Sequence, residues 1–426
     1  MEFINAKQNE SKITGANISV KVSNDFMLAL EREVIEDNKK VPENTYFLRY
    51  PVDYTFPFDS IKNGIEYRKE VEKLGLLQLP VNTLIPIHKK GQTIYVKKVN
   101  AKEIWDTLVH CAWNRAEPGV MFDDIHINYS PDGVYDQYRG VTTNPCGEIF
   151  MQPYDSCRLL HHNLFSYIQR ERNKDGILYG FDFNKFKKNA YLVSLLADDL
   201  VDLEVDALDS IINKIQSEHN PLDADELEMW QKLKENGLKG RRCGIGITAL
   251  ADAIAYCGYK YGSPEANTLE ESIFSSKLDA ELKAQGDMAV IRGTFDRWDR
   301  SKEFSLDQNF QLKGNNDFYQ FLCERAYPKT LEESNEKLDS LLRIYKYGHR
   351  NISWSTVAPT GSVSILAGTT SGIEPLFLPY YTRSRKVLEG EPRDFTDSNG
   401  DGFINYLVVH PKLKFWIKDH CTPEEI

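Results

Sequence analysis

Residues 143–149 read Thr-Asn-Pro-Cys-Gly-Glu-Ile, and this short stretch is the most informative part of the sequence for local structure and chemistry. Its proline lacks a backbone donor and its glycine permits unusual dihedral angles, so the stretch favours a projecting loop over a central strand. If the segment is extended, residues two apart point the same way, and Asn144, Cys146 and Glu148 share one cavity. An amide, a thiol and a possible general base together can form a reaction centre. A turn with a buried cysteine is the plainer alternative.

A second cysteine, Cys157, follows Cys146 after eleven residues. Two cysteines this close are either redox partners, or one of them fills a gap in the core. His161 and His162 come next, but adjacent side chains point in different directions. Without further ligands at a suitable spacing, we expect no metal site here.

The other informative stretch is residues 358–372, which begins Ala-Pro-Thr-Gly-Ser-Val-Ser and is rich in small and hydroxylated residues. Small residues let backbone N–H groups approach an anion, and hydroxyl groups add donors, so this stretch predicts a phosphate cradle if a helix starts there. It is not a Walker A loop, because no Gly-Lys-Ser/Thr follows. A turn rich in serine and threonine is the alternative.

Composition limits the class of protein. The 426 residues carry 52 basic and 63 acidic side chains, a net charge of −11, with 41% hydrophobic residues. This is ordinary for a globular domain and argues against binding of a nucleic-acid polymer, which needs clustered basic residues. We expect the basic runs 239–242 and 412–418 to be solvated faces. No apolar run is long enough for a membrane span and no secretory signal is recognisable, so no membrane association is expected.

Cysteine usage and hydrophobic patterning indicate a cytoplasmic α/β protein. The seven cysteines include no Cys-x-x-Cys pair, so a disulfide framework is not expected and a reducing cytosol is the simplest setting. Strand-like and long helical patterns alternate, which is typical of α/β architecture. We predict a strand at 18–22, helices at 101–116, 186–215, 224–235, 247–257 and 265–289, and a strand at 352–357. The Gly-x-Gly at 244–246 has no buried strand before it, so it is no dinucleotide fingerprint.

Taken together, these motifs resemble the large, catalytic subunit of ribonucleotide reductase, most closely its adenosylcobalamin-dependent class. The segments that carry the resemblance are Asn144–Ile149, Pro153–Cys157, Asn163–Leu164, Ala358–Gly361, Leu366–Gly368 and Ser371–Phe377. The spacing of the two cysteines fits the cobalamin class. In the class that uses a separate radical-generating subunit, the second cysteine usually lies farther on.

The resemblance implies a ten-stranded α/β barrel domain over residues 1–426, with a finger loop around 141–160 through its centre and a phosphate-binding loop around 358–372. It also implies an enzyme that reduces ribonucleoside diphosphates or triphosphates to 2′-deoxyribonucleotides for DNA synthesis. A cofactor-generated radical would make Cys146 a thiyl that abstracts the 3′ hydrogen. Glu148 would take the 3′-hydroxyl proton, and Asn144 would hydrogen-bond the substrate.

The resemblance assigns further residues and partners. Cys157 matches one member of a redox-active cysteine pair, whose other member is not found in this chain. The implied cofactor is adenosylcobalamin, and the implied reductant resembles thioredoxin or glutaredoxin. A second copy of the chain, forming a homodimer, is a further candidate partner. The residues implied to bind the substrate are Pro145, Gly147, Pro359, Thr360, Gly361, Ser362 and Val363.

The sequence departs from the family at both ends. The other redox cysteine and the effector-reading loop are expected upstream of residues 14–20, and more barrel strands beyond 382–385. Cys111 lies in a predicted helix and does not match the missing cysteine. We therefore interpret the chain as a fragment with an incomplete barrel, which needs a complementary reductase chain and is unstable or inactive alone. Two alternatives stay open: the class with a separate metal-radical subunit, and a non-catalytic nucleotide-binding or assembly fragment.

Overall fold

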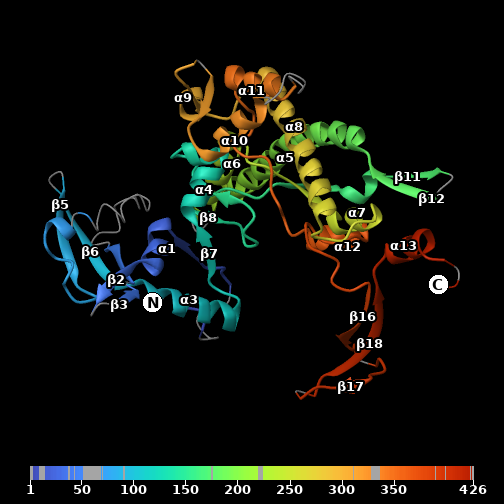
Figure 1. Cartoon of the computed structure of the whole chain (residues 1–426), viewed down its shortest axis with the longest axis horizontal. Coiled ribbons are helices and arrows are strands. Elements are labelled where there is room, and N and C mark those ends of the chain that lie inside the picture. Colours follow the sequence, from blue (N-terminus) through green and yellow to red (C-terminus); the bar gives the residue numbers. More distant parts are fainter. Residues whose placement is uncertain are drawn as a thin grey trace. The chain divides into compact units, whose positions relative to one another are not determined.

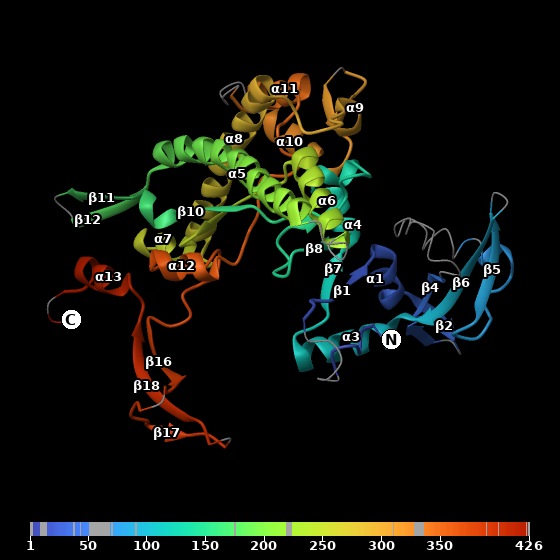
Figure 2. The same cartoon turned by 180° about the vertical axis from the view of Figure 1, so that it is seen from behind.

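The computed structural model describes residues 3–8, 15–36, 39–42, 44–50, 69, 71–89, 92–173, 176–218, 224–309, 311–327, 336–388, 390–398, 400–422 and 424. The chain divides into two compact units, Met1–Ser130 and Pro131–Ile426 (Figures 1 and 2). Each unit is described by itself below. In the described ranges, no helix combines the length and the apolar character that a membrane crossing requires.

The first unit joins a parallel strand pair to a small antiparallel sheet. Strand β1 (Ser19–Val22) pairs in parallel with β7 (Gly119–Phe122). The antiparallel elements are a sheet in the order β4 (Thr45–Tyr50), β6 (Gln92–Asn100) and β5 (Leu84–Lys89), and a hairpin of β2 (Glu33–Glu36) with β3 (Lys39–Pro42). The helices are α1 (Asn24–Glu31), α3 (Ala101–Arg115) and α4 (Asp123–Tyr129). The side chain of Ser23 caps α1 by accepting from the N–H of Phe26.

The second unit is built around parallel strands under two long helices. Strand β10 (Leu159–Asn163) pairs in parallel with β13 (Gly244–Thr248), and all five residues of β13 are buried. On its other side, β13 forms a parallel bridge between Ile245 and Ser355. Helices α5 (Phe183–Glu218) and α8 (Pro264–Arg292) lie side by side in both views, and α5 also contacts β10 and β13 (Figures 1 and 2).

The remaining elements of the second unit surround this centre. Its helices are η1 (Pro131–Val134), η2 (Leu164–Tyr167), α6 (Ala224–Gly240), α7 (Leu250–Tyr256), α9 (Arg300–Glu303), α10 (Asp317–Ala326), α11 (Glu336–Tyr347), α12 (Gly361–Ala367) and α13 (Leu413–His420). Its strand pairs are β8 (Thr142–Thr143) with β9 (Phe150–Met151), β11 (Ile168–Asn173) with β12 (Gly176–Phe181), and β14 (Phe304–Leu306) with β15 (Leu312–Gly314). Strand β18 (Gly402–Val409) lies between β16 (Tyr380–Lys386) and β17 (Phe395–Thr396).

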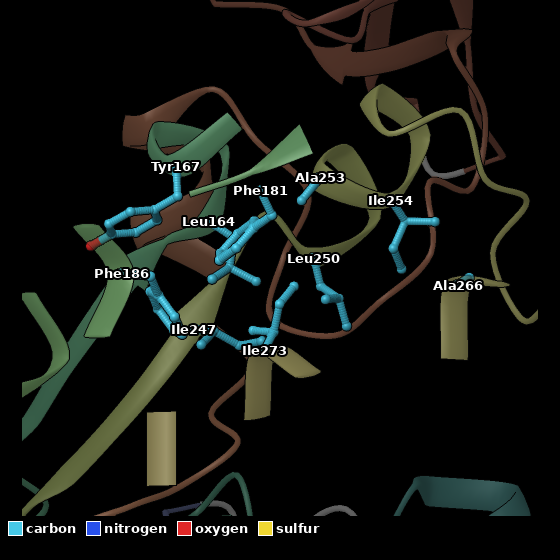
Figure 3. Close-up of a cluster of buried hydrophobic side chains, with 10 residues drawn as sticks. All are labelled: Leu164, Tyr167, Phe181, Phe186, Ile247, Leu250, Ala253, Ile254, Ala266 and Ile273. Carbon is cyan, nitrogen blue, oxygen red and sulfur yellow. The ribbon is translucent and has the colours of Figure 1, made fainter. Parts of the chain in front are cut away.

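A buried apolar cluster fixes β13 against η2, β12 and helices α5, α7 and α8 (Figure 3). Its aromatic members Tyr167, Phe181 and Phe186 meet edge to face or tilted, with ring centroids 5.0–5.8 Å apart. The aliphatic members Ile247 and Leu250 come from β13 and α7. Aromatic pairs in this geometry stabilise a core beyond the area that they bury, so β13 is held rigidly.

The α/β class, the first strand and the long helices are confirmed. The helix expected at 247–257 is wrong in its first part, because Ile247 and Thr248 end β13 and α7 starts only at Leu250. A closed ten-stranded barrel is not confirmed: in the described residues every sheet has two or three strands. A barrel closes only when hydrogen bonding continues around the whole ring, which these separate sheets do not provide. The single domain over 1–426 stays a prediction.

Candidate functional site

Residues 144–149, here called the finger tip, form the end of the hairpin between β8 and β9. The turn is closed by backbone hydrogen bonds from Gly147 to Asn144 (3.0 Å) and from Asn144 to Ile149 (3.1 Å). Gly147 has a φ of 86°, which favours glycine. The projecting loop is thus confirmed. The argument from an extended segment is wrong, because the chain reverses direction within the motif.

The three predicted catalytic side chains differ in exposure but converge on Cys157. Cys146 is exposed, Glu148 is half-buried and Asn144 is buried. The Asn144 side chain accepts the N–H of Ile149 at 3.0 Å, and its amide group donates toward the sulfur of Cys157 at 3.9 Å. Both Glu148 and Cys146 lie close enough for their charges to act on the Cys157 thiol. The structure therefore places the amide next to Cys157, with Cys146 and the Glu148 carboxylate within range of charge interaction.

The environment of Cys157 keeps its thiol protonated. Burial raises the pKa of this thiol to about 11, the charges of Glu148 and Cys146 add to the rise, and Arg158 opposes it. At neutral pH the group is therefore a thiol and a weak nucleophile. A protonated thiol suits a hydrogen donor better than an attacking group.

Two buried arginines hold the segment that carries Cys157. Arg242 donates from Nη1 to Asp132 at 3.0 Å and from Nε to Asp155 at 2.9 Å. Arg158, next to the cysteine, donates to the main-chain carbonyl of Arg242 at 3.0 Å. All four side chains are almost fully buried, so the pairs are well shielded from water. Losing one partner would leave an uncompensated charge, and the segment is correspondingly rigid.

The glycines of β13 leave room for side chains that pack directly on this strand, among them Ile149 of the finger tip. A Cβ placed at Gly244 would lie 2.7 Å from the Ile149 side chain, and one at Gly246 would lie 2.7 Å from the imidazole of His161. Residues two apart on a strand share a face, so both contacts lie on one side of β13. The two glycines lie inside the strand rather than in a turn after it. This confirms that the Gly-x-Gly is not a dinucleotide fingerprint.

Residues 358–372, here called the α12 loop, are fastened to the end of β13. Thr360 is buried in the left-handed region (φ 56°), and its hydroxyl donates to the Thr248 hydroxyl at 3.2 Å. The same oxygen accepts the N–H of Gly372 at 2.6 Å. Helix α12 begins without a side-chain cap, so the N–H groups of its first turn can serve a ligand. Exposed at this end are Pro359, Gly361, Ser362 and Val363.

Strand β13 places the finger tip and the α12 loop on one face. Ile149 lies over Gly244, and Thr248 binds Thr360. Positions 244 and 248 are an even number of residues apart and so face the same side, about 13 Å from each other at the rise of a strand. A thiol and a carboxylate thus lie at one end of this face, with free N–H groups at the other. Such a face suits a ligand that has a reactive part and an anionic part.

Two contributors to this face have no signal in the sequence. Thr248 anchors Thr360, and Thr356 donates its hydroxyl to the main-chain carbonyl of Glu148 at 2.9 Å. Threonine is common in strands, so neither residue stands out before the strands are placed beside each other.

One carboxylate cluster has the spacing of a metal site, but its neighbours are cations. Among the described residues it consists of Asp198, Asp199 and Asp202. Arg241 donates to Asp198 at 2.7 Å and to Asp202 at 2.8 Å, and Arg292 donates to Asp199 at 2.7 Å. These ion pairs neutralise the cluster. They also correct the expectation of a solvated face at 239–242, because Arg241 and Arg242 are both buried among carboxylates.

Comparisons with known proteins identify relatives. The family model of the ribonucleotide reductase barrel domain matches residues 1–399, across both compact units. A vitamin B12-dependent ribonucleoside-diphosphate reductase of Thermoplasma acidophilum is 26% identical over 92% of this chain and 35% of its own length. A protein of the same name from Mycobacterium tuberculosis is 26% identical over 70% of this chain and 33% of its own length.

A relative from Chlamydia pneumoniae, named ribonucleoside-diphosphate reductase subunit alpha, is 24% identical over 77% of this chain and 28% of its own length. The chain thus spans about a third of the length of the curated relatives it matches.

Proposed function

The chain belongs to the ribonucleotide reductase barrel-domain family, and we propose that it performs the radical-based reduction of ribonucleotides to 2′-deoxyribonucleotides. The observation that carries the proposal is the single face of β13. It holds the finger tip at Gly244 and the α12 loop at Thr248. In a ribonucleotide the phosphates are attached to the 5′ carbon of the ribose, so the reacting ribose and the anionic part follow one another along the molecule, which matches this order of groups.

The chemistry follows from the residues of the finger tip. A thiyl radical on Cys146 takes the hydrogen atom from C3′ of the ribose, and Glu148 accepts the proton of the 3′-hydroxyl. The 2′-hydroxyl then leaves as water, with a proton and reducing equivalents from Cys157 and a second thiol outside this chain. The same thiol pair supplies the hydrogen that C2′ gains, and Glu148 returns its proton to the 3′ oxygen. The hydrogen then returns from Cys146 to C3′, which restores the thiyl radical, and the two reducing thiols end as a disulfide. Asn144 holds the substrate and the tip in register.

The cofactor that the resemblance implies is adenosylcobalamin, and relatives are named vitamin B12-dependent. Such a bulky group must reach the sulfur of Cys146 from outside the hairpin. Cys146 is exposed, and a Cβ placed at Gly147 would meet nothing within 4 Å. The finger tip would therefore leave the Cys146 sulfur open to this cofactor, while Pro145 and Gly147 on the same exposed turn would contact the substrate. When bound, the group supplies the radical that makes Cys146 a thiyl.

We place the substrate phosphates at the α12 loop, over Pro359, Gly361, Ser362 and Val363, with Thr360 as its internal brace. Backbone N–H groups at a helix start bind anions without a basic side chain. This agrees with a chain whose net charge is −11.

We propose three kinds of partner for a chain working in the cytoplasm: a thioredoxin- or glutaredoxin-like reductant, a complementary reductase chain and a second copy of the chain. Support for a protein partner comes from exposed apolar side chains in the α12 loop and shortly after it. Ile365, Leu366 and Phe377 are 82%, 90% and 91% exposed. Large apolar side chains this exposed and this close in sequence are typical of a surface that another chain covers.

Product formation tests the proposal. The chain is incubated with a ribonucleoside diphosphate or triphosphate, a dithiol and adenosylcobalamin, with and without a polypeptide that supplies further barrel strands. We expect deoxyribonucleotide only with the cofactor and with that polypeptide. Cys146→Ser should abolish the product, whereas Cys257→Ser, at the end of α7, should retain it. Deoxyribonucleotide formed by the Cys146→Ser variant would overturn the mechanism. Deoxyribonucleotide formed without adenosylcobalamin would overturn the assignment of the cofactor.

A further inference from the structure

His161 belongs to β10, and its side chain lies on the side of the β10–β13 pair that the finger tip also covers. It pairs with Gly246 in the strand register, and a Cβ at Gly246 would lie 2.7 Å from its Cδ2 and 3.2 Å from its Nε2. Thr356 lies close both to Gly246 and to Glu148. Its carbonyl oxygen lies 3.4 Å from the same Cβ position, and its hydroxyl donates to the carbonyl of Glu148 at 2.9 Å. Thr356 therefore bonds the main chain of Glu148 and lies beside the position of β13 that His161 covers.

Each of these two side chains has a buried polar atom without a hydrogen-bond partner. In His161 the atom is Nε2, and in Glu148 it is Oε2. A neutral imidazole with its proton on Nε2 is a donor, and a carboxylate is an acceptor, so the two atoms are complementary. Buried polar groups are normally paired, and two complementary unpaired atoms on side chains whose charges interact need a reason. The adjacent His162, by contrast, already has a partner, since its Nδ1 lies 3.2 Å from the Tyr167 hydroxyl.

The charges around His161 keep the ring neutral. Burial lowers the pKa of His161, the carboxylate of Glu148 acts in the opposite direction, and Lys277 of α8 lowers it again. The Lys277 ammonium itself donates to the Ser355 hydroxyl at 2.6 Å and pairs with Glu281. Because the overall shift is downward, the imidazole carries a single N–H at neutral pH.

We propose that His161 is a positioning residue for Glu148, donating from Nε2–H to Oε2 of the carboxylate when a ribonucleotide occupies this face. The inference rests on the proposed function, in which Glu148 accepts the 3′-hydroxyl proton. The hydrogen bond fixes one carboxylate oxygen and turns the other, Oε1, toward the ribose. No proton passes through His161. It remains a neutral donor before and after Glu148 is protonated.

A spectroscopic experiment tests the contact without turnover. The full chain is labelled with 15N-histidine, and its imidazole signals are assigned with the His161→Gln variant and titrated with and without cytidine diphosphate. We expect an Nε2–H tautomer for His161. Because Glu148 raises the pKa of this ring, Glu148→Gln should lower the pKa of His161, the constant that the titration measures. An unchanged constant in Glu148→Gln, or a proton on Nδ1, would overturn the inference.

A kinetic experiment tests the role. His161→Leu should lower kcat about tenfold or more with little change in KM, because the substrate is still bound but Glu148 is less well placed. His161→Gln keeps a donor near the Nε2 position and should restore most of kcat. The matched control is His162→Asn, which preserves a partner for Tyr167 and should leave kcat unchanged. Equal losses in the leucine and glutamine variants would refute the positioning role.

The two experiments separate the inference from the function on which it rests. If the native complex makes no deoxyribonucleotide while the His161 signals still respond to Glu148→Gln, the proposed function fails and the contact stands. If turnover is normal and His161→Leu has no effect on kcat, the positioning role fails and the function stands.

Discussion

Replacing Gly244 by alanine tests whether the finger tip really rests on β13. The added Cβ would lie 2.7 Å from the side chains of both Ile149 and Leu159, and 3.0 Å from that of Thr356. Two carbon atoms in ordinary contact are about 3.5 Å apart, so the neighbours must retreat by about 0.8 Å. Leu159 belongs to β10 and is fixed by its ladder with β13, so we expect the finger tip to move most.

The magnitude follows from two opposing effects on stability. Overpacking a core costs about 1–3 kcal/mol, and alanine in place of a strand glycine returns about 0.5–1 kcal/mol. The net loss in free energy of unfolding should be between about 0 and 2.5 kcal/mol. Catalysis should suffer more, because a shift of about 1 Å in a reacting group can lower the rate about 100-fold. Gly244→Ala should therefore be folded and nearly inactive.

Urea denaturation followed by circular dichroism gives the stability, and deoxyribonucleotide formation gives kcat. Gly180→Ala is the matched control, since a Cβ there would meet nothing within 4 Å. The double variant Gly244→Ala with Ile149→Val removes one methyl group from the contact and should recover part of kcat. Wild-type kcat in Gly244→Ala would refute the reasoning, as would a double variant no more active than the single one.

Three further predictions use other parts of the site. Because the pKa of Cys157 is about 11 and Glu148 contributes to the rise, alkylation of this thiol should speed up about tenfold per pH unit between pH 8 and 10. Glu148→Gln should lower that pKa and speed alkylation at pH 8, and an unchanged rate would contradict the contact. His349→Leu removes the contact at 2.8 Å from the fully buried Glu303 carboxylate, which keeps Tyr135 at 2.7 Å and Trp298 at 3.1 Å, and should cost about 1–3 kcal/mol in urea denaturation. A loss below about 1 kcal/mol would show that the pair is not buried in solution. Thr360→Val removes the hydroxyl that joins Thr248 and Gly372, and should raise KM for the nucleotide about tenfold, while Thr360→Ser should not. Equal KM values for the two variants would show that the Thr360 hydroxyl does not hold the α12 loop in place for the nucleotide.

The long helices and the projecting loop could be predicted from local pattern alone. The amphipathic pattern of 186–215 is clear, and Pro145 with Gly147 disfavours a central strand. The run 247–257 failed because a short apolar stretch fits a buried strand and a helix equally well. Only pairing with β10 shows that Ile247 and Thr248 are strand.

The other wrong predictions have the same cause: the environment of the residue depends on a partner that is distant in sequence. Arg242 is paired with Asp132, 110 residues away, so its burial cannot be read from the basic run around it. The glycines of β13 are explained only by Ile149 and His161, which reach them through the fold. The approach of Cys157 to Glu148 likewise depends on how the finger tip turns.

The attachment of both loops to β13 also governs how this site can change over evolutionary time. A substitution in either loop alters what is bound, but the separation between the thiol and the anion-binding end stays constant. Inserting one residue into β13 would shift that separation by about 3.3 Å and turn every following side chain to the opposite face. Substitutions in the α12 loop can therefore adapt the site to longer or shorter ligands, whereas insertions in β13 cannot.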